Sequence, residues 1–166
     1  LAAPGQEAVR TADFHEFEEG GSLTLPADVR VFGPTPETDL PVSRNLEPEY
    51  IAIDGDVAYA ALQEANAVAV VDLDSATVTE IWALGFKDHS IDGNGLDPSD
   101  RDGGIDIRTI DGLQGIYMPD GMNAYEAGGE TYLVTANEGD AREWGDYVEP
   151  ARVKDLEDDG YGPVCE

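Results

Sequence analysis

The segment from Lys87 to Gly104, KDHSIDGNGLDPSDRDGG, gathers carboxylate side chains among glycines and has almost nothing apolar to bury. Calcium takes roughly six to eight oxygen ligands from carboxylates, amides and backbone carbonyls, and a loop of this composition can wrap such an ion. The loop does not follow the EF-hand pattern, because Thr109 stands where that pattern requires its final glutamate. A calcium loop outside the EF-hand class and a solvated, turn-rich connection both remain open. The candidate calcium ligands are Asp92, Asn94, Asp97, Asp100 and Asp102.

A second group of candidate residues lies in NEGDARE, directly after an inferred strand. Glu138 and Asp140 are further candidate ligands for the cation, and Arg142 can hold a carboxylate or another anionic group. An Arg–carboxylate pair that only pins a long loop fits the same residues. Lys87 and Arg101 carry the same two interpretations, anion binding or structural pairing.

Three glutamates flank the inferred strands: Glu47 and Glu49 in LEPEY, and Glu64 in LQEAN. We hypothesise that some of them line one central face of the assembled sheets together with these loops. Ordinary polar residues at strand ends are the alternative interpretation.

Composition excludes several other chemistries. The chain has 36 acidic residues against 9 Lys and Arg, a formal charge of -27, which repels nucleic acids and anionic membranes and favours cationic partners. With His15 and His89 as the only histidines, the sequence contains no histidine-based zinc motif. It also lacks a glycine-rich phosphate loop, and neither Ser90 nor Ser99 lies in a nucleophile-elbow motif. No stretch approaches the roughly 18 apolar residues of a membrane span, so no transmembrane segment is predicted.

The elements that must position these residues are strands. Between residues 50 and 84 the runs YIAI, VAYAAL, AVAVVDL and TVTEIWAL are separated by the turn segments DGD, QEAN and DSA. Four β-rich runs at this spacing predict a four-stranded antiparallel meander. The third run is apolar almost throughout, which is typical of a strand covered on both faces.

A second, incomplete copy of this unit follows. GMNAY and TYLVTAN predict two strands, and ARVKDL occupies the place that VAVVDL has in the first copy. The sequence therefore predicts an all-β fold, a partial β-propeller of about two four-stranded blades with long acidic loops. We expect four segments: an irregular N-terminal segment with one strand (1–45), a first blade (46–85), an acidic loop insertion (86–118) and a second, incomplete blade (119–166). A small self-contained β-sandwich is the alternative.

Long motifs across the chain carry a resemblance to a known family. NLEPEYIAI, AALQEANAVAVVDL, LGFKDHSIDGNGLDPSDRDGGI, YMPDG, TYLVTANEGDARE and ARVKDL occur in this order. Together they resemble the choice-of-anchor I proteins, secreted bacterial propeller proteins whose animal relatives are mesenchyme-specific cell-surface glycoproteins. The resemblance spans residues 11–156 and implies a WD40/YVTN-like propeller and export to the cell surface or the medium. The chain departs from it in IDGLQGIY, where relatives carry a Trp-Pro pair.

The expected function is that of a binding and structural module in a larger surface or matrix protein, with calcium as the bound cation. The resemblance also implies an association with biomineralization in the animal branch. The expected partners are divalent cations and either the remaining blades of the same protein or other copies of the chain. Because bacterial members are labelled alkaline phosphatase or phytase-like, the alternative is a metal-dependent phosphoesterase that uses the same carboxylates.

Overall fold

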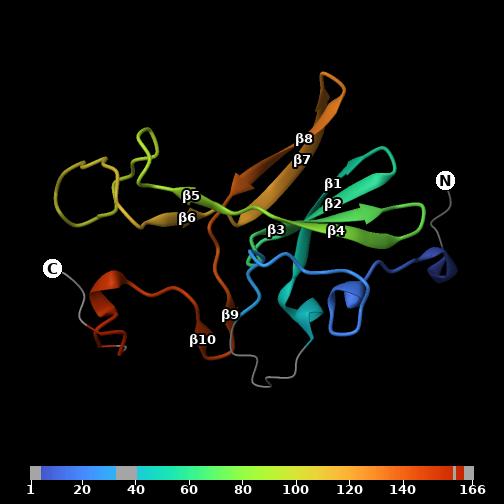
Figure 1. Ribbon diagram of the computed structural model, residues 1–166, viewed down its shortest axis with the longest axis horizontal. Coiled ribbons are helices and arrows are strands. Elements are labelled where there is room, and N and C mark those ends of the chain that lie inside the picture. The colour runs from blue at the N-terminus through green and yellow to red at the C-terminus, as the bar shows by residue number, and fades with distance from the viewer. Residues whose placement is uncertain (1–4, 33–40, 159, 163–166) are drawn as a thin grey trace.

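The structure, a computed structural model, describes residues 5–32, 41–158 and 160–162. Strands and short 3-10 helices are its regular elements, and these ranges contain no α-helix (Figure 1). The predicted all-β class is thereby confirmed. The 3-10 helices are η1 (Gln6–Ala8), η2 (His15–Phe17), η3 (Val42–Asn45) and η4 (Val153–Asp155).

The central element is the predicted four-stranded antiparallel meander. It consists of β1 (Pro48–Asp54), β2 (Val57–Leu62), β3 (Ala67–Asp72) and β4 (Thr77–Ala83), paired in the order β1-β2-β3-β4. The turn between β1 and β2 places Gly55 at φ +58°, which glycine adopts without strain. Short apolar and β-branched runs between turn residues are what the pleated, half-buried surface of a sheet requires.

Both faces of this sheet are covered. On one face Ala60, Leu62, Ala69 and Ile81 pack against Phe17 and apolar residues of the segments around η2 and η3, forming the main core. On the other face Ala52, Tyr59, Ala61 and Val68 are buried beside β7. Burial on both sides explains why all three residues of the first half of β3, 67–69, are buried.

Three two-stranded sheets complete the fold. β5 (Phe86–Asp88) pairs with β6 (Gln114–Ile116) at the base of the acidic loop, and β9 (Glu143–Trp144) pairs with β10 (Tyr147–Val148). The long hairpin of β7 (Pro119–Ala127) and β8 (Glu130–Asn137) projects beside the meander, and its β7 strand packs against β1 (Figure 1).

The second copy differs from the prediction. Its first two strands are present as β7 and β8, but ARVKDL forms the 3-10 helix η4 instead of a third strand. The run shares its Asp-Leu ending with VAVVDL, yet it carries Arg152 and Lys154 where β3 is apolar, so a sheet would gain little burial from it. No propeller is formed by the described residues.

The single strand expected within residues 1–45 is also not formed in the described part of that segment. There, Arg30 N donates to Ala65 O at 2.9 Å, and this bond attaches the segment to the β2–β3 turn. None of the helices that the structure describes is long and apolar enough to cross a bilayer.

Candidate functional site, an acidic cleft beside a buried arginine

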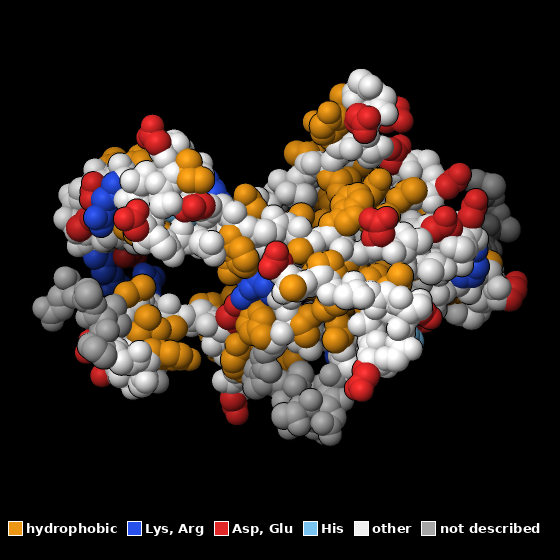
Figure 2. Space-filling view, viewed as in Figure 1, with side chains coloured by type: hydrophobic (Ala, Val, Ile, Leu, Met, Phe, Trp, Pro, Cys, Tyr) orange, Lys and Arg blue, Asp and Glu red, His pale blue; other side chains and the backbone are white. Residues whose placement is uncertain are grey.

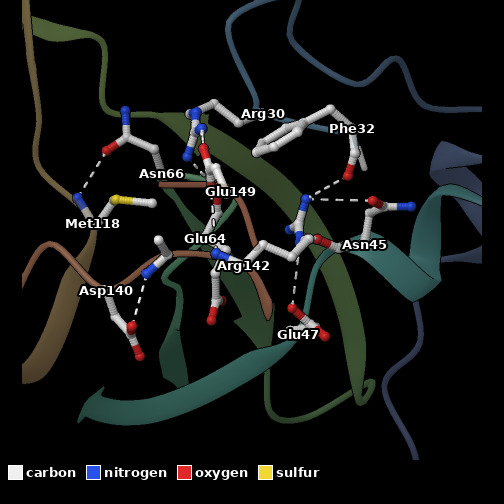
Figure 3. A network of polar contacts seen from close by, with 11 residues as sticks. Arg30, Phe32, Asn45, Glu47, Glu64, Asn66, Met118, Asp140, Arg142 and Glu149 are labelled. Carbon is white, nitrogen blue, oxygen red and sulfur yellow. Dashed lines mark hydrogen bonds and ion pairs between the residues drawn. The ribbon is translucent and has the colours of Figure 1, made fainter. Parts of the chain in front are cut away.

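Arg142 is the largest fully buried side chain among the described residues, with 1% of its surface exposed. Its Nη1 donates to Phe32 O at 2.7 Å and its Nη2 donates to Asn45 O at 2.8 Å (Figure 3). The guanidinium carbon lies 4.9 Å from the ring centre of Phe32 and 5.2 Å from that of Trp144. A guanidinium is the cation best suited to such a place, because it is planar, weakly hydrated and rich in fixed donors.

Glu47 links this arginine to the meander. Its Oε2 lies 3.6 Å from Arg142 Nε, and its Oε1 accepts a hydrogen bond of 2.9 Å from Trp144 Nε1. Glu47 adopts φ +37°, an uncommon conformation for a residue with a side chain. Contacts from Arg142 and Trp144 hold this conformation in place at the start of β1.

A second set of contacts fixes the β9–β10 hairpin to the same region. Glu149 Oε2 accepts a hydrogen bond of 3.1 Å from the backbone N–H of Arg142, and Glu149 Oε1 pairs with Arg30 (Figure 3). Arg30 Nη1 in turn donates to Glu64 O at 3.0 Å. The turn between β2 and β3, the N-terminal segment and the end of β10 are therefore joined by two arginines.

An open cleft of about 410 Å³ lies beside this network. Carboxylates dominate its lining, which is made of Glu47, Pro48, Glu49, Glu64, Asp140, Ala141, Glu143 and Trp144. We call it the acidic cleft. Glu138 lies close by, since its charge is among those that raise the pKa of Glu49, and its Oε2 accepts a hydrogen bond of 3.3 Å from Gln63 Nε2.

Two glutamates of the acidic cleft, Glu49 and Glu64, have pKa values above the ordinary one. Burial raises the pKa of Glu64, and the charges of Glu47 and Glu49 raise it further. Desolvation likewise raises the pKa of Glu49, followed by the charges of Asp120 and Asp140. One oxygen of Glu64, Oε2, is buried without a hydrogen-bond partner. Such crowding produces a negative potential that a cation relieves.

The sequence hypothesis placed some of Glu47, Glu49 and Glu64 on one face with the NEGDARE loop. The structure brings all three into one cleft with Asp140 of that loop. Arg142, for which anion binding and structural pairing were both open, lies buried against backbone carbonyls. Its guanidinium is thus directed away from any solvent-borne phosphate.

The loop from Lys87 to Gly104 lies elsewhere and uses several of its polar side chains for its own turns. Asp97 Oδ1 accepts a hydrogen bond from Ser99 N, and Asp97 Oδ2 accepts one from Asp106 N, both at 3.2 Å. Asp102 Oδ1 accepts one from Gly104 N at 3.3 Å. These are the local side-chain bonds typical of Asp in turns.

The remaining predicted residues of this region are mostly exposed. Asn94 Nδ2 donates to Asp88 O at 2.9 Å, and Asp92 and Lys87 face solvent. Asp100 lies 3.7 Å from both Arg101 and Arg152, at a groove between the loop and residues 150–157. Across the described part of the chain, no group of three or more His, Cys, Asp or Glu side chains is arranged to hold a metal ion.

Sequence reasoning missed four residues of the network: Arg30, Phe32, Asn45 and Glu149. The bonds that join Arg142 to Asn45 and Phe32 span 97 and 110 positions of the chain. The one available signal for such pairing was composition. With 36 acidic residues against 9 Lys and Arg, each arginine has many potential carboxylate partners.

Comparison with known proteins gives two matches and one absence. The family model described as "Choice-of-anchor I domain" matches residues 2–163. The chain is also similar to a mesenchyme-specific cell surface glycoprotein of Strongylocentrotus purpuratus, with 45% identity over 142 residues. That match covers 79% of this chain and 18% of the sea urchin protein, so the chain spans less than a fifth of its relative's length. No solved structure matches the chain.

Proposed function

Because the chain belongs to the choice-of-anchor I domain family, we propose that it is a binding and structural module of an exported or cell-surface protein. We further propose that its acidic cleft takes a divalent cation, with calcium as the first candidate. The sheets described above would form blades of a larger β-propeller in that protein.

The observation that carries the cation proposal is the mutual crowding of carboxylates in the acidic cleft. Glu49 and Glu64 have raised pKa values, caused first by desolvation and then by neighbouring negative charges. A hard cation with oxygen ligands relieves both effects, because it replaces lost hydration and offsets the repulsion. Since no three carboxylates of the described residues are already arranged around one point, their side chains must close around the ion as it binds.

Support for the location comes from the sea urchin relative, whose name describes a cell surface glycoprotein. A charge of -27 suits a protein that meets calcium-rich surroundings outside the cell, where cations neutralise part of the repulsion.

The test is thermal unfolding of the chain in increasing calcium chloride, against sodium chloride at matched ionic strength. Binding to the folded state raises the unfolding free energy by about 1.4 kcal/mol at ten times Kd, and this gain, and Tm with it, keeps rising with the logarithm of the calcium concentration. The double variant Glu49→Gln/Glu64→Gln should lose most of this calcium-specific rise. Glu126→Gln, an exposed carboxylate on the β7–β8 hairpin, is the matched control and should keep it.

Two results would contradict the proposal. One is a Tm that rises no further in calcium than in the matched sodium chloride. The other is a calcium effect that survives Glu49→Gln/Glu64→Gln and disappears in Asp92→Asn/Asp102→Asn, which would move the cation to the loop of residues 87–104.

A further inference from the structure

The few cations of the chain are not evenly spread. Only 9 Lys and Arg side chains stand against 36 acidic ones, yet three of them line one open groove. The groove lies between the loop of residues 87–104, which supplies Arg101, and the segment around η4, which supplies Arg152 and Lys154. Figure 2 shows Lys and Arg side chains on facing sides of a hollow at this end of the molecule. We call this hollow the basic groove.

The basic groove reverses the charge pattern of the rest of the chain. Its lining has three cations against two carboxylates, Asp100 and Glu157, whereas the whole chain has four carboxylates for every cation. Lys154 Nζ lies 2.5 Å from Asp155 Oδ1, so its charge is largely met within its own segment. The two arginines are therefore the groups best placed to hold an anion.

Asp100 marks the point at which the two arginines converge. Its Oδ1 lies 3.7 Å from Arg101 Nε, and its Oδ2 lies 3.7 Å from Arg152 Nη1. Both separations exceed the roughly 2.7–3.2 Å of a hydrogen bond, so the guanidinium donors are not used up by this carboxylate. The side chains of Arg101 and Arg152 are 74% and 63% exposed, which leaves the donors accessible. Two guanidiniums facing one carboxylate keep one positive charge uncompensated.

Much of the remaining lining is apolar. It includes Pro98 from the loop, and Pro150, Ala151 and Val153 from the opposite side. The volume of the basic groove, about 890 Å³, falls in the range of roughly 300–1,000 Å³ that is typical of sites for small organic molecules. An apolar body can lie on these side chains while an anionic head reaches the arginines.

We propose that the basic groove binds a small organic carboxylate with an apolar body. The carboxylate lies beside Asp100 and accepts hydrogen bonds from Arg101 and Arg152, because guanidiniums hold carboxylates through fixed pairs of N–H donors. One uncompensated positive charge matches a monoanion, whereas a polyanion would extend into the acidic surroundings and be repelled. The basic groove shares no lining residue with the acidic cleft, so this proposal does not depend on the proposed cation.

Titration of the 166-residue chain with octanoate tests the proposal, with the backbone amide NMR signals of Arg101, Arg152 and Val153 as the readout. These signals should shift in a saturable way. Octanol, which has the same carbon chain without the charge, should bind at least about tenfold more weakly, because it cannot pair with the arginines. Inorganic sulfate and phosphate should also bind at least about tenfold more weakly, because they leave the apolar lining uncovered.

Three single variants and one control assign the binding to named residues. Arg101→Gln and Arg152→Gln should each weaken octanoate binding at least about fivefold. Asp100→Asn should tighten it several-fold, because this substitution removes a negative charge that competes for the same donors. Arg108→Gln is the control, since Arg108 is exposed, pairs with Asp106 at 3.0 Å and does not line the basic groove. It should bind octanoate as the parent does.

The proposal is overturned if octanol binds as tightly as octanoate, because the basic groove then responds to the carbon chain alone. It is also overturned if inorganic sulfate or phosphate binds as tightly, which would make the basic groove a site for a bare oxyanion. Unchanged octanoate binding in both Arg101→Gln and Arg152→Gln would place the ligand elsewhere on the chain. Weaker binding in Asp100→Asn would mean that Asp100 positions the arginines and does not compete with the ligand, which contradicts the arrangement proposed.

Discussion

At the scale of single residues, Arg142 matters most, because its buried guanidinium satisfies two backbone carbonyls. Phe32 O and Asn45 O accept its two hydrogen bonds, and Glu47 lies beside its Nε. An unpaired buried acceptor costs about 1–3 kcal/mol, and removing an arginine of this size also leaves a cavity.

Arg142→Ala is therefore expected to lower the free energy of unfolding by about 3–5 kcal/mol. Arg142→Lys should recover only part of this loss, since an ammonium group cannot reach both carbonyls as a planar fork does. Urea denaturation measures the difference. Arg101→Ala, at an exposed arginine, is the control and should stay within about 0.5 kcal/mol of the parent. An Arg142→Ala protein as stable as that control would show that the network has little energetic weight.

Glu64 gives the protein a dependence on pH that can be isolated by substitution. Its pKa is raised above the ordinary value of 4.5 in the folded state, so the folded protein binds the proton more tightly than the unfolded chain. Stability from this group increases as pH falls through the raised pKa, and its ionisation is unfavourable at pH 7. Glu64→Gln should therefore stabilise the protein at pH 7, and the gain should vanish below about pH 4.5.

Asp72 provides the control of opposite sign. Hydrogen bonds from Ser75 hold its pKa below the ordinary value of 3.8, so its stabilising effect is present at neutral pH and is lost as pH falls through that lowered pKa. Asp72→Asn should destabilise the protein at pH 7 and have little effect at very low pH. Unfolding curves of both variants and the parent across pH measure the two differences. Parallel curves for Glu64→Gln and the parent would contradict the assignment.

At the scale of elements, Asn66 couples the meander to the two hairpins that follow it. It occupies the β2–β3 turn at φ +51° and is fully buried. Its Nδ2 donates to Gly85 O at 2.7 Å, just before β5, and its Oδ1 accepts from Met118 N at 3.1 Å, just before β7.

Asn66→Ala should cost about 2–4 kcal/mol, because it leaves a buried donor and acceptor unpaired and places alanine in a left-handed conformation. Asn66→Gly relieves the backbone strain but not the lost bonds, so it should recover about 1 kcal/mol of this. Hydrogen exchange should show faster amide exchange in β7 for both variants. Unchanged exchange in β7 would mean that the turn does not hold the hairpin.

Elements with strong local signals could be predicted from the sequence, and those that depend on distant partners could not. The meander was predictable because each of its strands is an apolar run between turn residues. The ARVKDL prediction was wrong because it relied on a shared Asp-Leu ending, whereas strand formation needs a partner edge and apolar faces. For the candidate site, the glutamates at strand ends were predictable from their position, but the arginine partners of the cleft were not, since they lie far apart in the chain.

At the scale of the whole molecule, a small apolar core sits inside a strongly acidic surface. The core of the meander is closed by the N-terminal segment on one side and by the β7–β8 hairpin on the other. Negative charge collects at the acidic cleft and in the loops, while the outer face of β7–β8 stays almost uncharged. The family assignment and the coarse fold followed from sequence, whereas the order in which the sheets stack required the structure.

The contacts of Arg142 also set an order of events during synthesis. Asn45 precedes its arginine partner by 97 residues and Phe32 precedes it by 110. At a translation rate of about 5–20 residues per second, these carbonyls emerge from the ribosome roughly 5–20 s before the guanidinium that will bind them. The meander can pair its strands in that interval, whereas the carbonyls of Phe32 and Asn45 have only water as a partner until Arg142 is synthesised.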